Sequence, residues 1–260
     1  MRSWDRSNAP QDHPDRPDQI SGRSGGSSGP KNRLLEALLR HAGERLRRSL
    51  EPVLLSDRKV LWEPGVSHNW FYFPQSSVVA IVLEFESGNT VQVTATGSEG
   101  VVPIAPLVGC ELTIARHVVQ VAGSAMRIKA PALLGTVENS PLRCPIIAGF
   151  VQVFLSRLLQ SVACNALHSV EERCSRWLLT TADSTDNSNV ALTHESLAEL
   201  LGVARPTVSV ATRALREAGL IRGSRGNIEI VDRRGLERAA CECYRIIRHM
   251  QEQLFAPAPE

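Results

Sequence analysis

The chain has 260 residues, of which 43% are hydrophobic, enough to fill the cores of two modest domains. Its 29 basic and 27 acidic residues give a formal net charge of only +2, which excludes a polycation or an acidic polymer. No apolar run approaches the roughly 18–20 residues of a membrane span, and the N-terminus lacks the apolar segment of a signal peptide. We therefore expect a cytoplasmic protein with no membrane contact.

The N-terminal segment, residues 1–31, is rich in Ser, Gly, Pro, Asp and Arg and has almost no apolar side chains. It cannot bury enough surface to offset the entropy of ordering, so we expect a disordered tail. Asn32 can then cap a short helix that carries leucines at helical spacing.

Between residues 53 and 131 the sequence consists of short β-branched or aromatic segments separated by Gly, Pro and Asn. Examples are the segments at 70–73, 78–83, 90–94 and 116–121. Several short strands with turn signals at this spacing predict a small antiparallel barrel or sandwich.

From about residue 141 to 168 the pattern becomes helical. An apolar seam runs along this segment at three- and four-residue steps, through Ile147, Val151, Phe154, Leu158 and Val162. Further apolar residues lie around the seam. Such a helix is either buried within its own domain or packs against two surfaces, its own barrel and a twin helix. A polar linker is expected at residues 183–189.

Residues 192–232 carry the local signals of two short helices followed by a β-hairpin. Thr193 is a good N-cap for the first helix, and Gly202 supplies the positive φ that commonly ends one. The second helix begins at Arg205–Pro206, because proline is well tolerated at the first helical position. Glycines lie at both ends of the turn at 223–226. This is the plan of a winged helix-turn-helix, which usually places one helix in the major groove of DNA.

In the second helix, Val208, Ala211 and Leu215 can face the core. The polar side chains then point mostly outward, and they are Arg205, Thr207, Ser209, Thr212, Arg213 and Arg216. Between residues 203 and 234, seven arginines stand against three acidic residues, a local net charge of +4. The excess favours contact with DNA phosphates; the alternative is a winged domain used for protein contacts.

The six cysteines contain no CxxC pair. Cys241 and Cys243 on one helix would point to different sides, so we expect no metal and no cofactor. A redox-sensing thiol is left open. The sequence has no P-loop, dinucleotide-binding glycine pattern, GxSxG or HExxH motif, so we expect no catalytic residues and no enzyme.

Taken together, barrel, long helix and winged module resemble the Crp–Fnr family of bacterial transcription regulators over about residues 33–250. The C-terminal third carries the resemblance most specifically, in the motifs Gly202-Val203-x-Arg205-x-x-Val208, Ala218-Gly219-Leu220-Ile221 and Arg225-Gly226-x-Ile228-x-Ile230-x-Asp232-Arg233. The segment Cys241-Glu242-Cys243-Tyr244 resembles one subgroup of the family.

The resemblance implies that Arg205 reads a base, where an arginine can pair with guanine O6 and N7. Pro206 and Val210 stand where cyclic-AMP-responsive members carry a glutamate and a second arginine, so a different operator is expected. The residues that then read or position DNA are Thr207, Ser209 and Arg213. Expected phosphate contacts are Thr193, Arg222 and Arg225.

In the sensor half, the resemblance places Glu99 near a ribose and Arg116 near a phosphate. A histidine follows Arg116 where cyclic-nucleotide binders have a small hydroxyl residue, and prolines interrupt the preceding loop. We therefore expect a degenerate pocket rather than a cyclic-AMP site.

The predicted fold is α+β, with an N-terminal antiparallel β-roll like a cyclic-nucleotide-binding domain, a long dimerisation helix and a C-terminal winged helix-turn-helix. The expected domains are a tail at 1–31, a sensor at 32–140, the helix at 141–168 and the DNA-binding domain at 169–260. The expected function is sequence-specific regulation of transcription by a homodimer on pseudo-palindromic double-stranded DNA. RNA polymerase is a further candidate partner. The alternative is a ligand- or protein-binding module.

Overall fold

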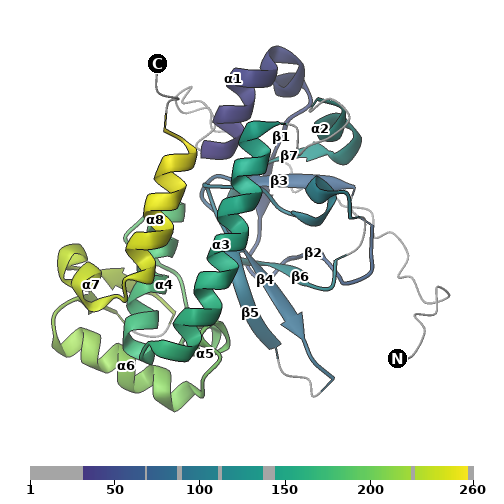
Figure 1. Ribbon diagram of the computed structural model, residues 1–260. Helices are drawn as coiled ribbons and strands as arrows, with labels where there is room; N and C mark the ends of the chain where they lie inside the picture. The colour runs from purple at the N-terminus through teal and green to yellow at the C-terminus, as the bar shows by residue number, and fades with distance from the viewer. Residues whose placement is uncertain are drawn as a thin grey trace.

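The computed structural model describes residues 32–67, 69–86, 90–110, 113–136, 144–223 and 226–256, without the side chains of residues 41 and 42. The tail expected at residues 1–31 lies outside this range. A β-roll lies on one side of the long helix α3 (Pro145–Leu167), and a helical C-terminal domain lies on the other side and at its lower end (Figure 1).

The β-roll consists of two antiparallel sheets, with strand orders β1-β7-β3 and β2-β6-β4-β5. Its strands are β1 (Glu51–Leu55), β2 (Val60–Trp62), β3 (Trp70–Pro74), β4 (Val78–Glu84), β5 (Thr90–Thr96), β6 (Arg116–Val121) and β7 (Gly123–Lys129). Phe71, Phe73 and Ile128 are fully buried between the β1-β7-β3 sheet and the covering helices. Those helices are α1 (Arg33–Arg48), the 3₁₀ helix η2 (Ala105–Val108) and α2 (Ala130–Thr136). The small antiparallel β-domain predicted from the sequence is thus confirmed.

Asn32 caps α1 and also fixes it to the β-roll. Its side-chain oxygen accepts from the backbone N–H of Leu35 at 2.9 Å, the N-cap bond expected from the sequence. Its side-chain nitrogen donates to the carbonyls of Pro74 (2.7 Å) and Gly100 (2.8 Å). Asn32 is fully buried, so these bonds satisfy a polar group that would otherwise be costly to bury.

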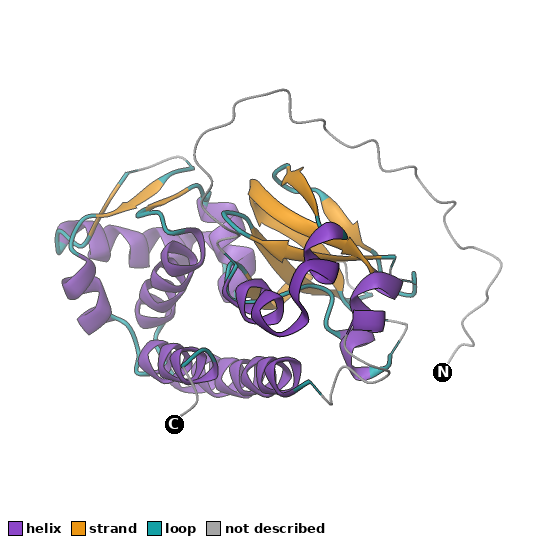
Figure 2. Cartoon of the chain, turned by 90° about the horizontal axis from the view of Figure 1, so that it is seen from above, coloured by secondary structure: helices purple, strands orange, loops and turns teal. Residues whose placement is uncertain are grey.

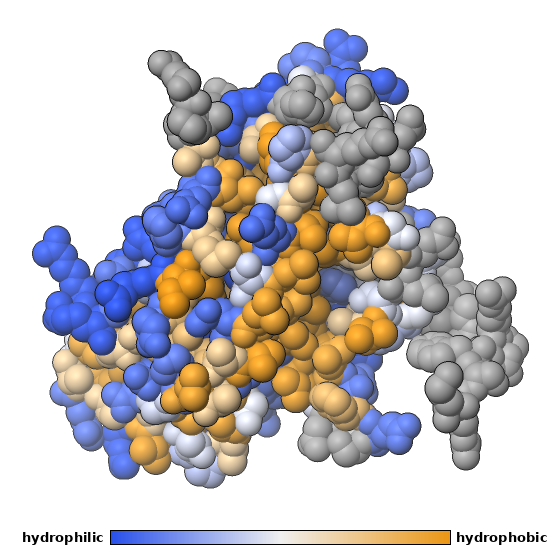
Figure 3. All heavy atoms as spheres, viewed as in Figure 1, coloured by the Kyte–Doolittle hydropathy of each residue, from blue (hydrophilic) through white to orange (hydrophobic). Residues whose placement is uncertain are grey.

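Helix α3 has apolar side chains on two faces. Ile147, Phe150 and Phe154 are buried against the β-roll. On another face, Leu155 and Leu159 are 53% and 73% exposed. Figure 3 shows hydrophobic residues gathered along α3 on this side of the molecule. The predicted seam is therefore divided: its buried members pack within the chain, whereas Val162 is 72% exposed.

The length and composition of α3 would suit a membrane span, which corrects the expectation that no apolar run approaches that length. One such helix is weak evidence for a membrane protein, because the core helix of a soluble protein can have the same length and composition. Helix α3 also buries a charged residue, Arg157, in an ion pair with the β-roll. The interpretation of α3 as a helix with two packing surfaces therefore fits better than its interpretation as a membrane span.

The C-terminal domain has the elements of a winged helix-turn-helix, with a small sheet in the order β8-β10-β9. They are α4 (Val170–Thr185), β8 (Asn189–Val190), α5 (His194–Leu201), α6 (Arg205–Glu217), β9 (Ile221–Arg222), β10 (Ile228–Ile230), α7 (Arg233–Ala239) and α8 (Cys243–Leu254). The two groups of strands lie at opposite ends of the view in Figure 2. Helix α4 extends to Thr185, so the first part of the expected polar linker at 183–189 is helical instead. The predicted α+β fold is confirmed.

The amphipathic pattern of α6 predicts how its residues contribute to stability. Leu215 is fully buried in the core of the C-terminal domain, whereas Val210 on the same helix is 58% exposed. We expect Leu215→Ala to lower the free energy of unfolding by about 2–5 kcal/mol, because it removes buried methyl groups and leaves a cavity.

The matched control, Val210→Ala, should change the free energy of unfolding by no more than about 0.5 kcal/mol. Urea unfolding followed by circular dichroism measures both variants. Equal losses for the two would contradict the assignment of the buried face.

Candidate functional site

The helix-turn-helix is built by three local signals that the sequence contains. The hydroxyl of Thr193 accepts from the backbone N–H of Ser196 at 3.1 Å and so caps α5. Gly202 ends α5 in the left-handed region, at φ 61°. Pro206 occupies the first turn of α6, where its missing N–H costs nothing. These features confirm the predicted boundaries of both helices.

The outer face of α6 is exposed and partly basic. Arg205, Thr207 and Arg213 are all exposed, as is Val210. In the described part of the chain, Arg205 and Arg213 have no acidic partner, so their guanidinium groups are available to an external acceptor. Val210 was not proposed as a site residue, although an exposed valine here can contact a thymine methyl group.

The inner polar side chains of α6 are engaged within the domain. Thr212 was expected to point outward, but it is 1% exposed and donates to the carbonyl of Val208 at 2.9 Å. The hydroxyl of Ser209 donates to the carbonyl of Arg205 at 3.2 Å and lies 3.3 Å from His194 Nδ1. Burial, followed by the charges of Arg216 and Arg205, lowers the pKa of His194. Ser209 therefore links α5 to α6.

In the wing, Arg222 is exposed, but its guanidinium pairs with Glu229 on the neighbouring strand, with Nη2 2.9 Å from Oε2. To contact a phosphate, Arg222 would have to divide its guanidinium between the phosphate and Glu229, or release Glu229. Arg225 lies outside the described residues. Arg216, at the end of α6, approaches the carbonyl of Gly223 at 3.4 Å.

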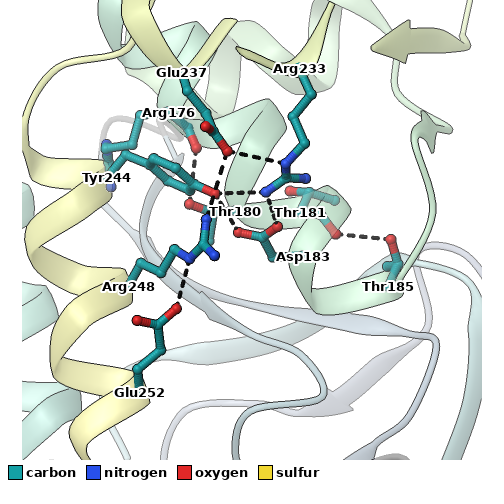
Figure 4. A network of polar contacts seen from close by, with 10 residues as sticks. All are labelled: Arg176, Thr180, Thr181, Asp183, Thr185, Arg233, Glu237, Tyr244, Arg248 and Glu252. Carbon is teal, nitrogen blue, oxygen red and sulfur yellow. Dashed lines mark hydrogen bonds and ion pairs between the residues drawn. The ribbon is translucent and has the colours of Figure 1, made fainter. Parts of the chain in front are cut away.

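Part of the local basic excess is neutralised inside the domain (Figure 4). Arg233 Nη2 lies 2.5 Å from Asp183 Oδ1 and 2.8 Å from the hydroxyl of Tyr244. That hydroxyl also donates to Asp183 Oδ2 at 2.8 Å. This network joins α4, α7 and α8. It fixes the C-terminal helix and engages Arg233 in contacts within the domain.

In the β-roll, the carboxylate of Glu99 is enclosed rather than open to a ligand. Its Oε1 lies 2.7 Å from Arg157 Nη1 on α3, and its Oε2 accepts from Ser184 on α4 at 3.1 Å. Arg157 also donates to the carbonyl of Ala95 at 2.6 Å. Both charged residues are buried. Arg157 and Ser184 were missed from the sequence because they lie 58 and 85 residues away from Glu99.

The loop around Glu99 packs closely against two helices. A Cβ at Gly97 would lie 2.4 Å from the Ser184 Cβ, and one at Gly100 would lie 2.4 Å from the Phe150 ring. The close approach of this loop to α4 and α3 therefore requires glycine at both positions. Residues 97–100 resemble a nucleotide-binding loop, and side chains of α3 and α4 pack directly against them.

Arg116 lies in a separate cluster. Its Nε donates to Glu63 at 2.7 Å, and its Nη2 lies 3.2 Å from Glu84. The hydrogen bond to Glu63 is the largest cause that raises the pKa of Arg116. Both predicted ligand residues thus have protein partners of opposite charge, and their role toward a ligand stays a prediction.

Four possible metal ligands meet at the end of α3: Cys164, His168, Cys241 and Cys243, whose donor atoms all lie within 4.8 Å of one another. The expectation that Cys241 and Cys243 point apart was wrong, because Cys241 precedes α8 and only Cys243 lies in it. The spacing of a helix therefore does not apply to this pair.

Comparison with known proteins shows what this arrangement resembles. Residues 172–239 match the Crp-like helix-turn-helix domain. A comparison with curated proteins gave no match. Among solved structures, the chain is similar to a CRP/FNR-family transcriptional regulator from Thermus thermophilus, with a TM-score of 0.57, 20% identity and coverage of 73% of this chain and 98% of that one.

The chain is also similar to FixK2 from Bradyrhizobium japonicum, with a TM-score of 0.57, 14% identity and coverage of 74% and 98%. A third similar structure is CLP, a c-di-GMP responsive global regulator from Xanthomonas campestris, with a TM-score of 0.55, 18% identity and coverage of 74% and 98%. At these identities the likeness concerns the fold.

The buried pair of Glu99 and Arg157 predicts a pH dependence. Burial alone would raise the pKa of Glu99, but the charge of Arg157 and hydrogen bonds from Arg157 and from backbone N–H groups outweigh it, and the pKa is lowered. A lowered folded-state pKa stabilises the fold above the unfolded value of about 4.3, and this contribution is lost as the pH falls through the folded value.

We therefore expect Glu99→Gln to lower the free energy of unfolding at pH 7 by about 3–5 kcal/mol, because it leaves the Arg157 charge buried without its partner. The gap between wild type and variant should narrow below about pH 4. The control Glu63→Gln breaks the half-exposed pair with Arg116 and should cost no more than about 1 kcal/mol. Urea unfolding at both pH values measures this, and a constant gap would refute the assignment.

Proposed function

We propose that this chain is a Crp/Fnr-family transcription regulator that binds pseudo-palindromic double-stranded DNA as a homodimer, which the match of residues 172–239 to the Crp-like helix-turn-helix domain supports. As such a regulator it is a DNA-binding protein and not an enzyme. The observation that carries the proposal is the outer face of α6, which is exposed and presents Arg205 and Arg213 without acidic partners in the described part of the chain.

Arg205 reads a base in this proposal, because it stands at the N-terminal end of α6, the end that usually contacts base edges. A guanidinium at this position can donate two hydrogen bonds to guanine O6 and N7. Thr207 and Arg213 read or position the DNA beside it. Ser209 acts mainly by holding the helix through its contact with His194.

Phosphate contacts position the domain in this proposal. Thr193 stands at the N-terminus of α5, where backbone N–H groups favour an anion. The wing supplies Arg222 and Arg225, and Arg222 exchanges its contact with Glu229 for a phosphate oxygen. Such contacts carry affinity and salt dependence but no sequence information.

The second copy of the chain covers the exposed face of α3. Leu155, Leu159 and Val162 follow one another at steps of four and three residues, the spacing of a helical seam. Each is more than half exposed, which is costly for a contiguous apolar stripe in water. Two α3 helices packed along this stripe would place the two α6 helices on one DNA duplex.

The β-roll acts as the sensor domain in this proposal, with an effector that the chain's chemistry leaves unassigned. The protein works in the cytoplasm, where its DNA is, and RNA polymerase is its further partner.

The domain boundaries proposed are 32–140 for the sensor, 141–168 for the dimerisation helix and 169–260 for the DNA-binding domain, with a tail at 1–31. The alternative, a protein-binding winged domain, differs in its dependence on Arg205.

Replacement of Arg205 tests the assigned DNA contact. We expect Arg205→Ala to reduce discrimination between the operator and non-operator DNA by about 1–3 kcal/mol, or roughly 5- to 150-fold. The control Arg58→Ala removes the same charge from an exposed position in the β-roll and should leave discrimination unchanged. Gel shifts with genomic promoter fragments at fixed salt measure both. If Arg205→Ala retained full discrimination, the protein-contact alternative would be favoured.

Replacement of Leu159 tests the dimer. Leu159→Glu places a charge in the proposed seam and should convert dimers to monomers in sedimentation velocity, because two carboxylates would be buried face to face. The control Leu54→Glu changes an apolar residue that is 45% exposed on β1 and should remain dimeric. A wild-type chain that sediments as a monomer would contradict the proposal.

A further inference from the structure

The end of α3 and the start of α8 bring four soft or borderline ligands together. Cys164 and His168 stand one turn apart at the C-terminal end of α3, and the backbone N–H of His168 donates to the carbonyl of Cys164 at 3.1 Å. Cys241 and Cys243 flank the start of α8. The three cysteines are buried and His168 is half-buried.

Two distances between these donor atoms are close to those expected around a single tetrahedral ion. The sulfurs of Cys164 and Cys241 lie 3.6 Å apart, and Cys243 Sγ lies 3.6 Å from His168 Nδ1. Zinc–sulfur bonds of about 2.3 Å in a tetrahedron place two sulfurs about 3.7–3.8 Å apart. All four donor atoms lie within 4.8 Å of one another, so they can surround one centre.

We propose that Cys164, His168, Cys241 and Cys243 bind one Zn²⁺ ion in a closed Cys₃His site. Thiolates with an imidazole in tetrahedral geometry are typical of zinc. Iron–sulfur clusters contain several metal atoms, and their ligands stand further apart than the ligands of a single ion. Four protein ligands leave no open position for substrate, so the site is structural and separate from the proposed DNA contacts.

The groups around the cluster fit this assignment. His168 Nε2 lies 3.1 Å from Glu242 Oε2, which leaves Nδ1 free to face the metal. A carboxylate on the far nitrogen is the usual way to orient a metal-binding histidine. Gln160 donates from Nε2 to Cys243 Sγ at 3.0 Å, a hydrogen bond that favours a thiolate.

The charge balance also fits. Three thiolates and Zn²⁺ carry a net charge of −1, and the side chains of Arg173 and Arg176 lie close enough to affect the charges of this cluster. The Nε atoms of both arginines are buried and have no hydrogen-bond partner in the described part of the chain.

A zinc ion here would join two helices that run side by side in opposite directions. Helix α8 begins at this cluster and its far end reaches α3 again, where Leu254 contacts Gly149 (Figure 1). The cluster also adjoins the junction between α3 and α4, at His168 and Ser169. The ion therefore holds α8 and the start of the C-terminal domain against the dimerisation helix.

Metal analysis of the full chain tests the site directly. Protein purified with a thiol reductant and without chelator should contain one zinc per chain. After exchange, Co²⁺ should give thiolate-to-metal charge-transfer bands and the intense visible bands of tetrahedral cobalt. Zinc-free protein with no cobalt spectrum would overturn the proposal. A Cys164–Cys241 disulfide, found by mass spectrometry in protein purified with the reductant, would also overturn it.

Variants separate a metal site from buried thiols that only pack. Cys243→Ser should lose the zinc and the cobalt bands, whereas Cys174→Ser, which alters a fully buried cysteine outside the cluster, should keep one zinc per chain. Glu242→Ala keeps all four ligands and changes a residue that is 59% exposed, so it should fold and bind zinc about 10- to 100-fold more weakly. Unchanged zinc affinity in both Cys243→Ser and Glu242→Ala would contradict the assignment. DNA binding is scored separately, since the proposed function does not depend on the ion.

Discussion

Helix α3 is apolar around most of its circumference, and the β-roll covers only one face of it. Burial of Ile147, Phe150 and Phe154 fixes the β-roll to the helix, because each large side chain removed from water contributes roughly 1.5–3 kcal/mol. The uncovered stripe at Leu155, Leu159 and Val162 needs a second surface. One helix therefore accounts both for the position of the β-roll and for the proposed dimer, and the winged domain follows directly from its C-terminal end.

The polar contacts of α3 determine how it is arranged against the β-roll and α4 more specifically than its apolar contacts do. Arg157 reaches from α3 to Glu99 in the β-roll, and the same carboxylate accepts from Ser184 in α4. A buried ion pair adds little net stability compared with apolar residues, but it tolerates few alternative arrangements because each charge needs its partner. Glu99 thus holds its own loop of the β-roll, helix α3 and the winged domain in one arrangement. A signal that reaches this loop would act on all three.

Much of the fold was predictable because its signals are local. The cap at Thr193, the left-handed Gly202 and the apolar face with Val208 and Leu215 are properties of short segments, and they fixed the helices of the winged domain. The enclosed state of Glu99 was not predictable, because its partners lie far away in the chain. The cysteine–histidine cluster was missed for the same reason, and because Cys241 lies outside the helix that was assumed for it.

In the proposed dimer, α3 pairs two chains so that two copies of α6 enter one DNA duplex. Dimethyl sulfate footprinting on a bound promoter fragment measures this most directly, because it reports guanine N7 in the major groove. Two protected patches are expected, with centres about one helical turn apart, about 10–10.5 base pairs. A single protected patch, or binding without any protection in the major groove, would contradict it.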